Sequence, residues 1–146
     1  MKKFIFRDLF DHPKFEKGVY WTQKSYQAND TIFSENDLGE ELYFIFKGSV
    51  RIFGSVTLDE HKNIHPGFCD LVENDIFGEM CLFDKGLRSA GAVAITDTEL
   101  AVMNEEKFIH FLEQNTDIGF FVIKHLYSLL VQRLRSTNKR FSSIFA

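Results

Sequence analysis

The chain has few cysteines, no excess of positive charge and no long apolar run, and each shortage argues against a class of protein. Its two cysteines, Cys69 and Cys81, have neither CxxC spacing nor a histidine cluster beside them, which disfavours a metal site and a structural disulfide. The net charge is −4, whereas a DNA-binding domain normally carries a basic face. No apolar run approaches the roughly 20 residues of a membrane span, and Arg7 and Asp8 end the first apolar stretch too early for a signal peptide. We therefore expect a cytoplasmic protein that binds neither DNA nor membranes.

The size and composition fit one globular domain. A chain of 146 residues can bury a core without metals or cross-links. Its 17 phenylalanines indicate a thick, β-rich core, because aromatic rings pack well on a half-buried pleated surface. The sequence has no internal repeat and no low-complexity linker. We assign residues 1–146 to a single domain and expect no room for a second one after the last helix.

Short β-type runs fill the middle of the chain, from about 26 to 103. Apolar and aromatic residues mark the expected strands at 31–33, 42–46, 50–53, 68–76, 91–95 and 99–103. Residues that tolerate turn geometry, such as Asn29, Asn36, Gly48 and Asn74, separate these runs. Strands at this spacing favour a sandwich or barrel over βαβ units. Residues 57–67 are expected to form a solvated connecting loop.

Helices are expected at both ends. Apolar residues among charges, interrupted by Pro13, predict a short helical cap within about 1–25. Asn104 and the acidic residues after it predict a capped short helix, and a second helix should run from about 117 to 141. The apolar residues of this second helix exceed one stripe, so we expect a second partner surface, most simply the same helix of another subunit. A broad stripe buried within one chain is the alternative.

The segment 77–90 combines residues suited to an anion and a hydroxyl. Gly78 permits a close backbone turn, and the N–H groups after it can face an anion. Arg88 supplies a guanidinium and Ser89 a further donor. Glu79 would be repelled by the anion unless it binds a neighbouring hydroxyl. From the residues alone, a structural ion pair between Glu79 and Arg88 is an equal alternative.

This stretch resembles the phosphate-binding cassette of the cyclic-nucleotide-binding domain family, which includes catabolite activator proteins, regulatory subunits of cyclic-AMP-dependent protein kinase and cyclic-nucleotide-gated channels. The family pattern F-G-E-x-x-L, then R-[S/A/T]-A, stands here at residues 77–82 and 88–90. The upstream residues 31–50 and the downstream residues 94–100 also match the family, so that the resemblance covers roughly 26–141. Two departures are Asn36 and Asn74 in place of turn glycines; asparagine tolerates left-handed backbone, so the turns should survive. We expect the activators' helix-turn-helix domain to be absent.

The resemblance implies a mainly β fold with flanking helices: a double-stranded β-helix (jelly-roll) barrel with short N-terminal helices and a long C-terminal helix. In this reading Glu79 accepts a hydrogen bond from the ribose 2′-hydroxyl and Arg88 pairs with the cyclic phosphate. Thr137, with Asn138 of the partner subunit, would read the edge of adenine, and Arg133 would approach the ligand. An ordinary polar helix surface is the alternative for these three. The implied ligand-binding residues are Phe77, Gly78, Glu79, Met80, Cys81, Arg88, Ser89, Ala90, Arg133, Thr137 and Asn138.

We therefore expect a regulatory sensor domain that binds a cyclic nucleotide and transmits its occupancy through the C-terminal helix to an unknown downstream protein. Cyclic AMP is favoured over cyclic GMP because family members that prefer guanine often place threonine where this chain has Ser89. A homodimer through the long helix is expected, and no cofactor or metal. The alternative is a degenerate, ligand-free dimerisation scaffold. The sequence contains no Ser-His-Asp arrangement, so we do not expect an enzyme.

Overall fold

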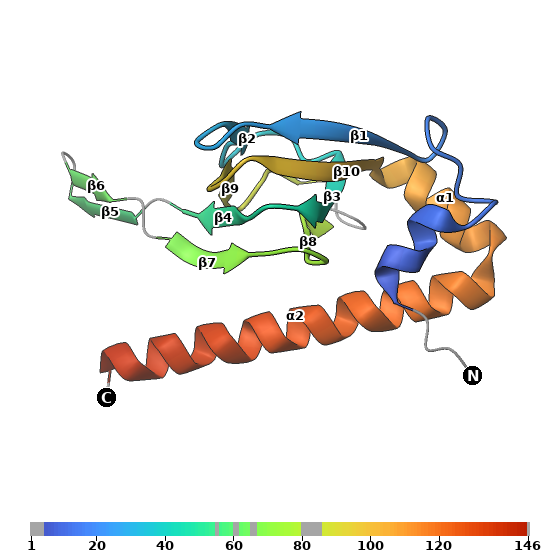
Figure 1. Ribbon diagram of the computed structural model, residues 1–146. Helices are drawn as coiled ribbons and strands as arrows, with labels where there is room; N and C mark the ends of the chain where they lie inside the picture. Colours follow the sequence, from blue (N-terminus) through green and yellow to red (C-terminus); the bar gives the residue numbers. More distant parts are fainter. Residues whose placement is uncertain (1–4, 55, 60–61, 65–66, 80–85, 146) are drawn as a thin grey trace.

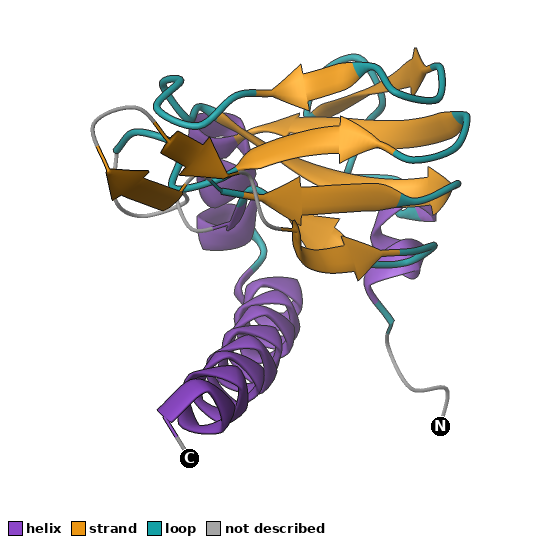
Figure 2. Cartoon of the chain, turned by 90° about the vertical axis from the view of Figure 1, so that its left-hand side faces the viewer, coloured by secondary structure: helices purple, strands orange, loops and turns teal. Residues whose placement is uncertain are grey.

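The computed structural model describes residues 5–54, 56–59, 62–64, 67–79 and 86–145 of the chain. Figure 1 shows a β sandwich with short helices at one end and a long C-terminal helix running along its flank. Figure 2 shows the same long helix below the strands, with its last turns extending away from the short helices. Among the described residues, no helix combines the length and apolar character that crossing a membrane requires.

Eight of the described strands form two antiparallel sheets of four, in the orders β1-β10-β3-β8 and β2-β9-β4-β7. Neighbours within a sheet are mostly distant in sequence, so the chain passes back and forth between the sheets as in a jelly roll. This topology confirms the predicted fold class. The strands are β1 (Trp21–Tyr26), β2 (Thr31–Phe33), β3 (Glu41–Lys47), β4 (Val50–Phe53), β5 (Val56–Asp59), β6 (Lys62–Ile64), β7 (Gly67–Leu71), β8 (Ile76–Phe77), β9 (Gly91–Ala94) and β10 (Thr98–Asn104).

The described helices are η1 (Phe6–Asp11), which is of the 3-10 type, α1 (Glu105–Gln114) and α2 (Thr116–Phe145). As predicted, Asn104 caps α1: its side-chain oxygen accepts a hydrogen bond from the backbone N–H of Lys107 at 3.1 Å. At Gly119 of α2, a Cβ atom would lie 2.8 Å from the carbonyl oxygen of Leu112. Glycine at this position therefore permits the close approach of α1 and α2.

Strand β3 is buried on both faces, which explains its uninterrupted apolar sequence. Successive side chains of a strand point to opposite sides of the sheet. Leu42 and Phe44 belong to a core cluster that includes residues of η1, α1 and α2. Tyr43 and Ile45 belong to a second cluster, between the two sheets. The helices therefore cover one face of this sheet, and the second sheet covers the other.

The structure differs from the sequence prediction at the N-terminal boundary of the sandwich. β1 begins at Trp21, inside the range 1–25 expected as a helical cap, and η1 is the only helix among the described residues of that range. Residues 22–25 of β1 are exposed, so the strand lacks the alternation of apolar and polar residues by which a half-buried strand is recognised.

Residues 57–67 also differ from the prediction, because they contain strands rather than only a loop. β5 and β6 pair with each other as an antiparallel hairpin, which projects from the end of the sandwich (Figure 1). The sequence prediction treated this stretch as a loop, because strands of only four and three residues give a short pattern to recognise. The turns at Asn36 and Asn74, by contrast, are as predicted: both residues adopt φ of 72°, in the left-handed region.

Candidate functional site

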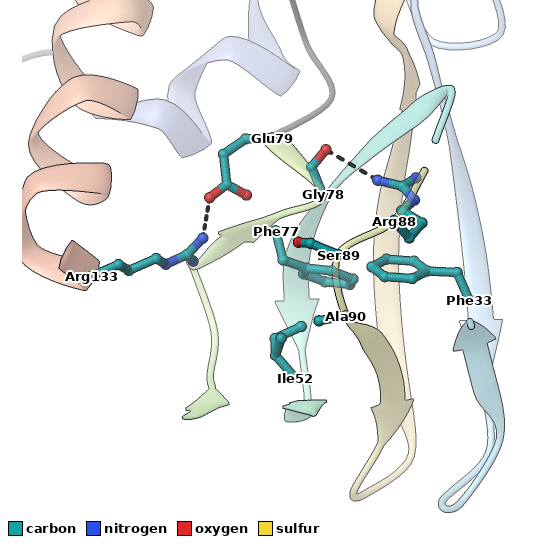
Figure 3. Close-up of a pocket in the computed structure, with 9 residues that line it drawn as sticks. All are labelled: Phe33, Ile52, Phe77, Gly78, Glu79, Arg88, Ser89, Ala90 and Arg133. Atoms are coloured by element: carbon teal, nitrogen blue, oxygen red, sulfur yellow. Dashed lines mark hydrogen bonds and ion pairs between the residues drawn. The ribbon is translucent and has the colours of Figure 1, made fainter. Parts of the chain in front are cut away.

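A pocket opens between the two sheets and α2, around the predicted anion-binding segment. Its wall combines β8 of one sheet with β2 and β4 of the other. Residues 78–79 and 88–90 of the predicted anion-binding segment and one side chain from α2 complete it. Figure 3 shows Arg88 and Phe33 on one side of the pocket and Glu79 with Arg133 on the other. The residues that line it are Phe33, Ile52, Phe77, Gly78, Glu79, Arg88, Ser89, Ala90 and Arg133.

Gly78 makes the turn that follows β8. Its φ of +81° lies in the left-handed region, where side chains are rarely accommodated. A Cβ atom there would lie 3.0 Å from both Nη1 of Arg88 and the carbonyl oxygen of Glu41. Glycine is therefore favoured at this position for two reasons: the left-handed backbone conformation and the close approach of the Arg88 side chain.

Arg88 is a buried cation that lacks an acidic partner among the described residues. The residue as a whole is only 5% exposed. Nη2 donates to the carbonyl oxygen of Glu41 at 2.7 Å and Nη1 to that of Gly78 at 3.2 Å, while Nε is buried without a partner. A buried charge is costly unless it is paired. Arg88 therefore places at the pocket wall a guanidinium whose charge an anion would neutralise.

The backbone of Arg88 is fixed by the turn after β2. The backbone N–H of Asn36 donates to the carbonyl oxygen of Arg88 at 2.8 Å, and the N–H of Arg88 donates to that of Asp37 at 2.7 Å. The carboxylate of Asp37 in turn accepts from the N–H of Ser34 at 2.9 Å, which closes the turn. The left-handed backbone of Asn36 thus contributes directly to placing Arg88.

Glu79 pairs with Arg133 of α2 and not with Arg88. Nη1 of Arg133 forms an ion pair with the Glu79 carboxylate, whose side chain is 3% exposed. Nη2 of Arg133 donates to the carbonyl oxygen of Ile76 at 2.5 Å. The alternative in which Glu79 and Arg88 close the loop as a structural ion pair is therefore wrong for this structure. The Glu79 carboxylate and the Arg88 guanidinium line the same pocket separately.

The structure brings most of the predicted ligand-binding residues together. Ser89 and Ala90 line the pocket beside Arg88. Met80 and Cys81 lie outside the described residues. Other predicted residues that line the pocket are Phe77, Gly78, Glu79, Arg88 and Arg133.

Thr137 and Asn138 are exposed and are not among the described residues that line the pocket. The Thr137 hydroxyl donates to the carbonyl oxygen of Arg133 within α2, at 2.9 Å. Both residues lie about one turn beyond Arg133 along α2. The role of Thr137 and Asn138 in reading a base therefore stays a prediction.

Two residues that line the pocket, Phe33 and Ile52, were not in the predicted set. Each belongs to a strand that the sequence did predict. Phe33 is the last residue of β2, immediately before the turn that holds Arg88. Its place next to this turn could have identified Phe33 as a pocket residue. Ile52 carried no signal, because an apolar residue in a strand is ordinarily part of the core.

Tyr43, the second aromatic ring near the Arg88 guanidinium, is uncharged. Burial, with the nearby Glu41 carboxylate as the next cause, raises the pKa of Tyr43 well above its ordinary value. The Tyr43 ring stacks on Phe77 with ring centroids 4.9 Å apart. Tyr43 is therefore a neutral phenol at physiological pH and does not compete with an anion for Arg88.

Comparisons with known proteins agree with this geometry. The family described as "Cyclic nucleotide-binding domain" matches residues 23–115. A curated relative, "Cyclic AMP receptor protein" of Thermus thermophilus, is 33% identical over 119 residues, which are 82% of this chain and 51% of the relative. This chain thus spans about half the length of that relative.

Two solved structures are similar over most of the chain. The catabolite activator protein of Thermus thermophilus aligns with a TM-score of 0.72 and 29% identity, over 91% of this chain and 63% of that chain. A cyclic nucleotide-binding domain from Methylobacillus flagellatus aligns with a TM-score of 0.74 and 26% identity, over 83% and 66%. With the family match over residues 23–115 and the pocket built by Glu79 and Arg88, these similarities show that the chain belongs to the cyclic nucleotide-binding domain family.

Proposed function

We propose that the pocket binds cyclic AMP and that the domain is a regulatory sensor rather than a catalyst. The observation that carries this proposal is the buried guanidinium of Arg88, which has no acidic partner among the described residues and lines the same pocket as the carboxylate of Glu79. A cyclic phosphate supplies the anion that Arg88 lacks. The neighbouring ribose hydroxyl supplies a donor for Glu79. The name of the Thermus relative points to the same ligand.

The remaining pocket residues suit the rest of a nucleotide. Ser89 carries a hydroxyl beside Arg88 and can donate to a phosphate oxygen. Ile52 and Phe77 provide apolar surface for the sugar or base. Thr137, whose oxygen can still accept a hydrogen bond, and Asn138 of a second subunit are the candidates for reading adenine. Ser89 in place of threonine favours cyclic AMP over cyclic GMP.

The Arg133–Glu79 ion pair supports transmission through α2. The carboxylate that would accept the ribose hydroxyl is the same one that holds the helix. A ligand that strengthens or weakens this ion pair binds some positions of α2 more tightly than others. Ligand binding then shifts the populations of these helix positions. The helix therefore connects occupancy of the pocket to a downstream protein.

A dimer through α2 is the second part of the proposal. The exposed face of this helix carries residues separated alternately by three and four positions, the spacing of a coiled-coil seam. All but Thr137 are large apolar residues with at least 40% exposure. The seam residues, as we use the term below, are Phe120, Ile123, Tyr127, Leu130, Leu134, Thr137, Phe141 and Ile144.

Titration calorimetry with cyclic AMP and cyclic GMP tests the binding proposal. We expect saturable binding of cyclic AMP by the wild type, and its loss in Arg88→Ala. Arg51→Ala is the matched control, because Arg51 forms an exposed ion pair with Asp70 outside the pocket. If neither nucleotide binds the wild type, the proposal fails, and a ligand-free dimerisation scaffold becomes the better description. Tighter binding of cyclic GMP would overturn the choice of base.

A further inference from the structure

The guanidinium of Arg88 lies against the ring of Phe33. The Cζ atom of Arg88 is 4.2 Å from the centroid of the Phe33 ring, and 5.8 Å from that of Tyr43. Figure 3 shows the Phe33 ring directly beside the Arg88 side chain at the pocket wall. An aromatic face at this distance attracts a cation through the negative charge above the ring.

The Phe33 ring is itself held by other rings. Its centroid is 5.7 Å from that of Tyr43 and 6.0 Å from that of Phe77. Because Tyr43 and Phe77 are both buried, this support belongs to the core between the two sheets. Phe33 is therefore a rigid platform and not a mobile surface ring.

One short segment fixes both partners of this contact. Phe33 is the last residue of β2, and the turn that follows it bonds the backbone of Arg88 through Asn36 and Asp37. Nη2 and Nη1 of Arg88 each donate one hydrogen bond, to the carbonyl oxygens of Glu41 and Gly78 respectively, and each carries a second N–H. The Cζ atom lies over the Phe33 ring, and Nε is the one guanidinium nitrogen without a hydrogen-bond partner among the described residues.

We propose that Phe33 is a positioning residue for Arg88: its ring face holds the guanidinium at the pocket wall, in place for a ligand phosphate. The part of this inference that concerns the phosphate rests on the proposed function. The part that concerns the position of Arg88 rests on the structure alone. Leucine would fill much of the same volume but has no aromatic face, whereas tyrosine keeps the face.

The first test needs no ligand. In nuclear magnetic resonance spectra of the ligand-free protein, the Nε–H proton of Arg88 should be shifted upfield by the Phe33 ring and should exchange slowly with water. Phe33→Tyr should preserve both properties. Phe33→Leu should lose the upfield shift and exchange faster, because the guanidinium is no longer held against a ring.

The second test measures affinity for cyclic AMP by titration calorimetry. Phe33→Leu should bind about tenfold more weakly than the wild type, while Phe33→Tyr stays within about twofold. Phe46→Leu is the matched control for loss of an aromatic ring from the core. Phe46 contacts Phe10 and Trp21 and lies outside the pocket, so its substitution should lower the melting temperature and leave the affinity unchanged.

The outcomes separate the two proposals. If Phe33→Leu keeps the wild-type Nε–H signal and the wild-type affinity, the role of Phe33 is refuted. Equal losses in Phe33→Leu and Phe33→Tyr would refute it as well, since the ring face would then not be the cause. If the wild type binds no cyclic AMP, the proposed function fails, and the Nε–H signals alone decide whether Phe33 positions Arg88.

Discussion

The carboxylate of Glu79 forms its ion pair with Arg133, 54 positions later in the sequence, and not with Arg88. The pair joins the pocket to α2. The Glu79 side chain is 3% exposed and that of Arg133 is 28% exposed. The helix therefore supplies the counterion for the acidic group of the pocket, and this leaves Arg88 as the group that needs an anion.

Removing this counterion should destabilise the ligand-free protein. Arg133→Gln would leave the carboxylate of Glu79 buried without its partner, so we expect the free energy of unfolding to fall by roughly 2 kcal/mol, less than for a fully buried pair because Arg133 is partly exposed. Adding Glu79→Gln should recover part of this loss. Urea unfolding of the wild type, both single variants and the double variant measures the coupling. Strictly additive effects would contradict a direct interaction.

Gly78→Ala should destabilise the fold and weaken the pocket. The left-handed backbone alone costs a side chain roughly 1 kcal/mol, and the new methyl group would also crowd Arg88. Gly18→Ala is the control, because Gly18 has φ of +87° with no atom within 4 Å of an added Cβ. Denaturant unfolding should therefore show a larger loss at Gly78 than at Gly18. Equal losses would mean that Arg88 moves aside without penalty.

A charge in the seam of α2 should dissociate the proposed dimer. Tyr127→Glu would place two carboxylates at the apolar contact, and we expect the dissociation constant to rise by at least about tenfold. Ser128→Glu introduces the same charge at the next residue, outside the seam, and should leave the dimer intact. Sedimentation velocity at several concentrations distinguishes the two. A wild type that is monomeric throughout would refute the dimer itself.

Stability should depend on pH through His125 of α2. Partial burial lowers the pKa of His125 below its usual value of 6.5, and the nearby Asp75 carboxylate opposes this shift. The folded state thus favours the neutral imidazole, so its contribution to stability is present above pH 6.5 and is lost as the pH falls through the lowered pKa. Unfolding measured from pH 7.5 to 5 should show a smaller loss in His125→Gln than in the wild type. Identical slopes would exclude His125 as the source.

The sequence predicted the elements whose physical signals are local. The cap at Asn104 depends on a side chain and a backbone group three residues apart. The turns at Asn36 and Asn74 depend on the conformational tolerance of single residues. Gly78 and Arg88 were found because their spacing belongs to a recognisable family pattern.

The features that the sequence missed depend on contacts between distant segments. Nothing local to Glu79 or Arg133 indicates that these two side chains meet. The edge strand β1 shows no alternation because residues 22–25 face solvent. The role of Phe33 is visible only once the Arg88 guanidinium is placed against its ring. The chemistry of a side chain can be read from the sequence. The residue that it contacts is determined only when the two sheets and α2 pack together.

The wall of the pocket draws on both sheets and on α2 at once. The sheets cannot separate without emptying it, so any ligand held there acts as a non-covalent cross-link of the whole sandwich. Ligand at a hundredfold excess over its dissociation constant would add about 2.7 kcal/mol to the free energy of global unfolding. Backbone amides deep in β3 and β4, far from Arg88 along the chain, would then exchange with solvent about a hundredfold more slowly.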